Sequence, residues 1–85
     1  MLNTEGVGAI LIIEDEKLLA DSIEALLTSR GFVTETAYDG ESGLAYAELN
    51  IYDLLILDIM LPKIDGYQVA RRLRARRQGT PILML

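Results

Sequence analysis

Carboxylates follow two apolar runs in this sequence, and their chemistry is its most informative property. Glu14 and Asp15 come directly after the run 10–13, and Asp58 comes directly after the run 54–57. Short Val, Ile and Leu runs are typical of central strands in a parallel sheet, which binds ligands at the carboxyl ends of its strands. Three carboxylates that lie close together repel one another unless a cation joins them. The pattern therefore predicts a site for a hard divalent cation at this edge.

The composition restricts the chemistry that such a site can perform. The 85 residues include no Cys and no His, which excludes disulfides, thiolate zinc sites, thiol nucleophiles and imidazole bases. A net charge of −5 argues against direct binding to nucleic acid, which requires a basic surface. No apolar stretch reaches the about 20 residues of a membrane span, and the first nine residues lack the features of a signal peptide. We therefore expect a cytoplasmic protein with no membrane contact.

The spacing of apolar residues predicts the elements that position the carboxylates. Strands are expected at 9–13, 32–37, 53–57 and 82–85, and helices at 17–30, 41–49 and 66–77. Strands that alternate with helices in this way indicate parallel crossovers in an α/β layer fold. We expect residues 1–8 to form a flexible leader and residues 9–85 to form one domain.

Within these elements, several residues have expected structural roles. Leu19, Ile23 and Leu26 follow a helical period and are expected in the core, and Gly31 is expected to end the first helix. Asp65 is expected to cap the third helix, with Gly66 behind it as a close-packing residue. Five arginines are expected on the solvated outer face of that helix: Arg71, Arg72, Arg74, Arg76 and Arg77.

Three segments together resemble the receiver domain of bacterial response regulators. They are residues 12–16, residues 57–62 with Asp65 and Gly66 behind them, and residues 80–85. The resemblance implies a flavodoxin-like doubly wound parallel sheet of the (βα)5 type. It also implies that residues 9–85 form a partial receiver domain that stops after strand four and lacks the fourth helix, the fifth strand and the fifth helix.

The resemblance implies a role for each acidic residue. Asp58 would accept a phosphoryl group from a sensor histidine kinase, and Glu14, Asp15 and Asp58 would hold Mg²⁺ together with the backbone carbonyl of Met60. The implied protein is a phosphoacceptor in two-component signalling rather than a turnover enzyme. Its partner would be an output domain outside this segment, with a DNA-binding transcriptional domain as the preferred candidate.

The residue types suit this chemistry independently of the resemblance. Mg²⁺ prefers oxygen ligands and keeps several waters, so it needs no histidine. A carboxylate such as Asp58 is already ionised and requires no base to act as a nucleophile. Phosphoryl transfer to a carboxylate depends mainly on positioning and on neutralising charge.

Other interpretations remain open from the sequence. The chain could be a receiver-shaped interaction module that does not switch, because the hydroxyl residue after strand four and the later lysine of a complete receiver are absent from it. A metal-dependent phosphatase is disfavoured, since Met60 stands where a second acid would be needed. Asp58 could also simply cap the loop that follows it. The apolar run 82–85 is expected to be an exposed edge strand, which predicts homodimerisation or strand exchange.

Overall fold

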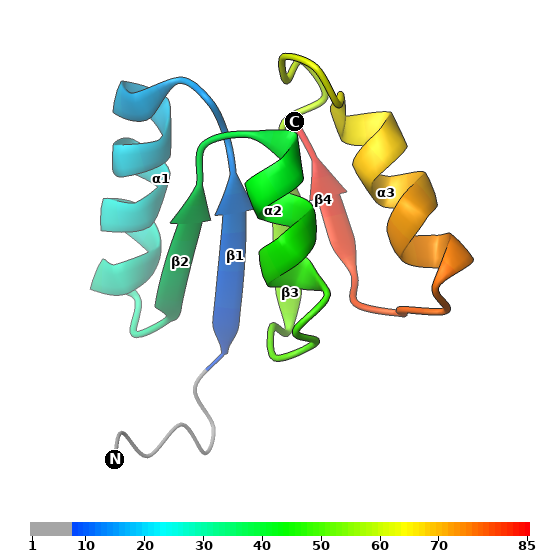
Figure 1. Cartoon of the computed structure of the whole chain (residues 1–85). Helices are drawn as coiled ribbons and strands as arrows, with labels where there is room; N and C mark the ends of the chain where they lie inside the picture. The colour runs from blue at the N-terminus through cyan, green and yellow to red at the C-terminus, as the bar shows by residue number, and fades with distance from the viewer. Residues whose placement is uncertain (1–7) are drawn as a thin grey trace.

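The computed structural model describes residues 8–85 (Figure 1), so all but the last residue of the expected leader lies outside the described residues. Strands and helices alternate along the chain as β1 (Ala9–Ile13), α1 (Lys17–Ser29), β2 (Val33–Ala37), α2 (Gly40–Ala47), β3 (Leu54–Leu57), α3 (Gly66–Ala75) and β4 (Ile82–Met84). The type and order of every predicted element are confirmed. The bounds of β1 match the prediction, and the ends that differ elsewhere do so by one or two residues.

The four strands form one parallel sheet in the order β2-β1-β3-β4. β1 and β3 are neighbours, and Ile13 is paired with Leu57 at their carboxyl ends. This strand order makes β1 and β3 the central strands, as their continuous apolar sequences predict. The structure is therefore an α/β fold with four parallel strands and three helices in the described part of the chain, which agrees with the fold class expected from the sequence.

Alternate residues of β1 are buried on opposite faces of the sheet. Leu11 and Ile13 belong to a core cluster that includes Leu44 of α2 and Leu73 of α3. Ile10 and Ile12 belong to a second cluster, against which α1 packs. The sheet thus lies between two helical layers, with α2 and α3 on one face and α1 on the other.

The prediction that Leu19 and Leu26 belong to the core is wrong. Their side chains are 41% and 57% exposed. Ile23 does pack against the core, together with Leu27, and Ala20 is fully buried. α1 is the only described helix on its face of the sheet, so it buries a narrow stripe and leaves its flanking leucines in contact with solvent.

Local interactions define the ends of the helices. Gly31 has a φ of 91° after α1, a left-handed conformation that favours glycine. Asp65 forms a capping box with Gln68, with hydrogen bonds of 2.9 and 3.0 Å between side chains and backbone N–H groups. The predicted cap of α3 is confirmed. None of the helices within residues 8–85 is long and apolar enough to cross a lipid bilayer.

Gly43 allows α2 to approach β1 closely, which yields a stability prediction. A Cβ at Gly43 would lie 2.7 Å from side-chain atoms of Ile13, a fully buried residue. We expect Gly43→Ala to lower the free energy of unfolding by about 1–2 kcal/mol, because overpacking outweighs the gain in helix propensity. The measurement is urea unfolding followed by circular dichroism.

Gly79→Ala is the matched control, since no atom lies within 4 Å of the Cβ it would carry. We expect this variant to match the parent chain within a few tenths of a kcal/mol. Equal stabilities for the two variants would contradict the close approach of α2 to β1.

Candidate functional site

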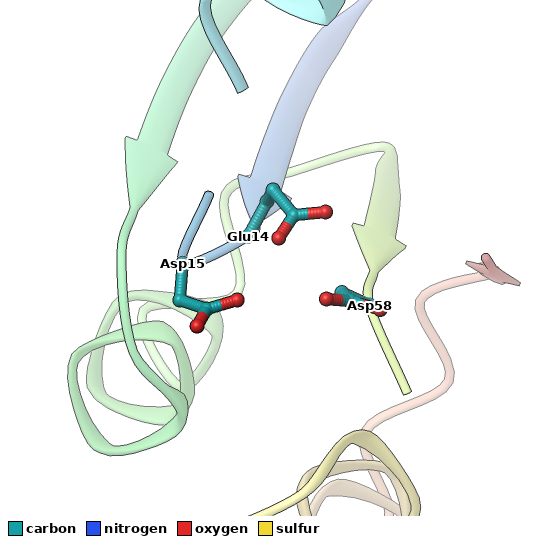
Figure 2. Close-up of side chains that lie close together, drawn as sticks. All are labelled: Glu14, Asp15 and Asp58. Atoms are coloured by element: carbon teal, nitrogen blue, oxygen red, sulfur yellow. The ribbon is translucent and has the colours of Figure 1, made fainter. Parts of the chain in front are cut away.

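The three predicted acidic ligands converge at the carboxyl edge of the sheet. Glu14 and Asp58 directly follow the paired residues Ile13 and Leu57, and the backbone N–H of Asp58 donates to the carbonyl of Ile13 at 3.0 Å. One carboxylate oxygen from each of Glu14, Asp15 and Asp58 lies within 4.8 Å of the others (Figure 2). The predicted convergence of these residues is confirmed by the geometry.

Glu14 is held more firmly than its position in a loop suggests. Its side chain is 2% exposed, and its backbone N–H donates to the carbonyl of Ala37 at the end of β2. Its Oε2 accepts a hydrogen bond of 3.0 Å from the backbone N–H of Glu16. Glu14 is therefore a buried, oriented carboxylate, whereas Asp15 is exposed and Asp58 is partly buried.

The electrostatics of the site disfavour three free negative charges. Burial raises the pKa of the Glu14 carboxyl, and the adjacent Asp58 raises this pKa further, whereas the hydrogen bond from the Glu16 backbone lowers it. A cation that touched these oxygens would remove both the desolvation penalty and the repulsion. The donor set consists only of oxygens, which suits Mg²⁺ because this ion takes one or two carboxylates and keeps several waters.

Asp58 also performs the structural role that the sequence allowed. Its Oδ1 accepts a hydrogen bond of 3.1 Å from the backbone N–H of Met60, which is the geometry of an Asx turn. This bond orients the Asp58 carboxylate toward the other two acids (Figure 2). Asp58 therefore stabilises the turn after β3 and also belongs to the acidic cluster.

The side chain of Met60 is exposed to solvent. The predicted role of its carbonyl as a ligand stays a prediction.

Gly66 brings the start of α3 against the backbone of the acidic loop. A Cβ at this position would lie 2.8 Å from the Cα of Ile59 and would also collide with the carbonyl oxygen of Asp58. The N–H of Gly66 donates to the carbonyl of Ile59 at 3.0 Å. The close-packing role expected of Gly66 is confirmed, and it holds the segment that carries Asp58.

Two contributors to the site were not found from the sequence. The N–H groups of Glu16 and Met60 orient Glu14 and Asp58 respectively. Each donor lies two residues after the carboxylate it contacts. This spacing of two residues is the signal that the sequence offers for such a hydrogen bond. The bond forms only where the backbone turns directly after the carboxylate.

Comparisons with known proteins agree with this geometry. The family model described as "Response regulator receiver domain" matches residues 10–85. The chain is 46% identical over 76 residues to the transcriptional regulatory protein DltR of Streptococcus agalactiae and to the response regulator ArlR of Staphylococcus aureus. In both cases the match covers 89% of this chain and 34% of the relative, so the chain spans about a third of the length of these relatives.

Solved structures show the same fold. The receiver domain of a Francisella response regulator has a TM-score of 0.87 at 30% identity, over 91% of this chain and 64% of that one. The receiver domain of the hybrid histidine kinase CckA has a TM-score of 0.83 at 37% identity, over 91% of this chain and 73% of that one. The chain therefore belongs to the response regulator receiver domain family of two-component systems.

Proposed function

We propose that Asp58 accepts a phosphoryl group from a phosphohistidine of a sensor histidine kinase, and that Glu14, Asp15 and Asp58 hold the Mg²⁺ that supports this transfer. The observation that carries the proposal is the convergence of the three carboxylates at the end of β1 and β3. Membership of the receiver family supports the same assignment. The carbonyl of Met60 is proposed as a further ligand, two residues after Asp58 in the same loop.

The proposed step forms a bond between phosphorus and an Asp58 carboxylate oxygen and breaks the bond between phosphorus and the kinase imidazole nitrogen. A carboxylate nucleophile needs no general base, because it has no proton that must be removed. The hydrogen bond from the Met60 N–H holds one carboxylate oxygen and leaves the other as the candidate nucleophile. Bound Mg²⁺ would neutralise charge on the phosphoryl oxygens.

The product would change the charge at the edge of the sheet. An aspartyl phosphate carries more negative charge than the carboxylate it replaces and adds three acceptor oxygens. We propose that this change is transmitted to an output domain outside the segment described by the structure. DltR is named a transcriptional regulatory protein, which supports a transcriptional output in which DNA is contacted elsewhere and not by this segment. We also propose a cytoplasmic location, where a kinase domain and DNA are both accessible.

Phosphorylation of Asp58 can be measured directly. After incubation with Mg²⁺ and acetyl phosphate, we expect intact mass spectrometry to show one added phosphoryl group. We expect Asp58→Asn to remove the adduct, because an amide is not a nucleophile of this kind. Asp53→Asn is the matched control and should leave the adduct intact. Asp53 lies just before β3, at the end of this strand opposite to Asp58.

Two outcomes would contradict the proposal. An adduct that persists in folded Asp58→Asn would place the phosphoryl group on another residue. A parent chain that is folded by circular dichroism and acquires no adduct would favour the alternative function, a receiver-shaped interaction module that does not switch.

The raised pKa of Glu14 predicts how stability depends on pH and on Mg²⁺. The raised pKa means that the native state binds the Glu14 proton more tightly than the unfolded state does. The protonated carboxyl therefore contributes to the free energy of unfolding. This contribution is fully present below the ordinary pKa of glutamate and is lost as pH rises through the raised pKa. We expect the metal-free chain to lose stability across this interval. Mg²⁺ at about 100 times its Kd should restore about 2.7 kcal/mol at neutral pH.

Glu14→Gln separates the two effects. The amide retains an oxygen that can accept from the Glu16 N–H, but it carries no charge. Thermal melts should show a metal-free variant whose stability changes less with pH and a smaller stabilisation by Mg²⁺. Glu24→Gln on α1 is the control and should behave as the parent chain. An unchanged response to Mg²⁺ in Glu14→Gln would remove Glu14 from the ligand set.

We also propose that the 85-residue chain self-associates or exchanges strands through β4. Among the described residues, β4 pairs only with β3, and Leu83 is 52% exposed beside this open edge. Sedimentation velocity should show association that rises with concentration and weakens in Leu83→Lys. Leu26→Lys, on the exposed side of α1, is the control. A chain that stays monomeric at its highest soluble concentration would contradict this proposal.

A further inference from the structure

α2 has apolar residues on its outward face as well as on its buried face. The buried residues of α2 are Gly40, Gly43, Leu44 and Ala47. The exposed residues with helical spacing i, i+3, i+4 and i+7 are Ser42, Ala45, Tyr46 and Leu49. We call this second set the α2 stripe. Tyr46 within α2 and Leu49 just after its end are exposed large apolar side chains, so the α2 stripe is a candidate contact surface.

The α2 stripe lines a hollow that a side chain could enter. Its four residues surround a shallow volume of about 390 Å³. Leu49 is 60% exposed at one end, and Ile51 follows it with 63% of its surface exposed. Tyrosine is enriched at the centres of protein interfaces, and Leu49 adds a second exposed apolar side chain beside Tyr46.

Arginines lie beside the α2 stripe. Five of the eight cationic residues of the chain fall within residues 71–77, although the whole chain has 13 acidic residues. All five are exposed, in α3 or directly after it. Arg76 forms an ion pair with Glu48, the residue immediately before Leu49. Arg72 precedes Arg76 by four residues, so it lies on the same flank of α3.

A second hollow extends the surface between the ends of α2 and α3. It has a volume of about 240 Å³ and is lined by Glu48, Asn50, Leu73, Arg76, Arg77 and Gln78. The side-chain oxygen of Gln78 is buried and accepts no hydrogen bond from the described residues. This hollow is therefore lined by two guanidinium groups, of which that of Arg76 is paired with Glu48.

We propose that the α2 stripe and the flanking Arg72 and Arg76 dock an acidic amphipathic helix of a partner protein. Leucine-sized side chains of that helix would cover Tyr46 and Leu49, and its carboxylates would face the guanidinium groups. The α1 helix of a second copy carries Lys17 beside Asp21, so its exposed face is not uniformly acidic. Nucleic acid carries no aliphatic side chains to cover Leu49.

The proposal does not depend on the chemistry at Asp58. The α2 stripe and the arginines do not include any residue of the acidic cluster. The Asp58→Asn variant should therefore bind the partner helix as the parent chain does. This separates a failure of the docking proposal from a failure of the phosphorylation proposal.

The test uses the 85-residue chain and a designed helical peptide of roughly 16 residues. The peptide carries leucines at i, i+3, i+4 and i+7, with glutamates beside them. Binding is followed by amide chemical shifts of the labelled chain. We expect saturable shifts in α2 and α3, and an affinity at least about tenfold higher than that of a scrambled peptide of the same composition.

Variants assign the contacts. Leu49→Ser and Arg72→Glu should each weaken binding by at least about fivefold, because the first removes an apolar contact and the second places like charges together. Leu26→Ser on α1 and Arg30→Glu at its C-cap are the controls. Leu26 is exposed to nearly the same extent as Leu49, and neither control should change the affinity.

Several outcomes would overturn the proposal. Shifts that do not saturate would remove the docking site. Equal binding by a peptide with lysines in place of the glutamates would remove the role of the arginines. Tighter binding by a short DNA duplex than by the peptide would show that the arginines bind phosphate groups rather than carboxylates. Self-association that is weakened by Leu49→Ser would assign the surface to a second copy of the chain.

Discussion

The burial of Glu14 beside Asp58 is the interaction on which the rest of the site depends. Burial raises the pKa of the Glu14 carboxyl, and the adjacent Asp58 raises this pKa further. The main chain maintains the arrangement, because the pairing of Ile13 with Leu57 fixes the residues that follow them. The packing of the sheet therefore holds the carboxylates of Glu14 and Asp58 close together although they repel one another, and a bound cation would relieve this repulsion.

The packing around this site is arranged so that backbones approach closely. Gly43 lets α2 lie against Ile13, and Gly66 lets α3 begin against the carbonyl of Asp58. Both glycines act through the absence of a Cβ, since neither has a left-handed φ. The two strands that carry the acids are thus supported by tight helix contacts on the face that holds the larger core cluster. Such support favours a site whose carboxylates stay in place when a charged group arrives.

Charge is distributed unevenly over this small domain. The acidic cluster occupies the carboxyl edge of the sheet, while the arginines gather along α3 and at its end. The first region suits a cation and a phosphoryl group, and the second suits an acidic protein surface. A net charge of −5 does not reveal this separation, because it averages two regions that have different chemistry.

Sequence patterns alone predict the type and order of all seven elements, the cap at Asp65 and the three acids of the site. These features depend on local spacing and on the rule that parallel strands bind ligands at their carboxyl ends. Long-range packing, in contrast, controls which apolar side chains are covered. Leu19 and Leu26 have the same helical period as Ile23. Ile23 nevertheless packs against the sheet, whereas Leu19 and Leu26 are exposed to solvent. The burial of Glu14 and the proximity of the α2 stripe to the arginines are likewise long-range outcomes. Periodicity identifies a helix and its apolar positions, but neighbouring elements determine which of those positions are removed from water.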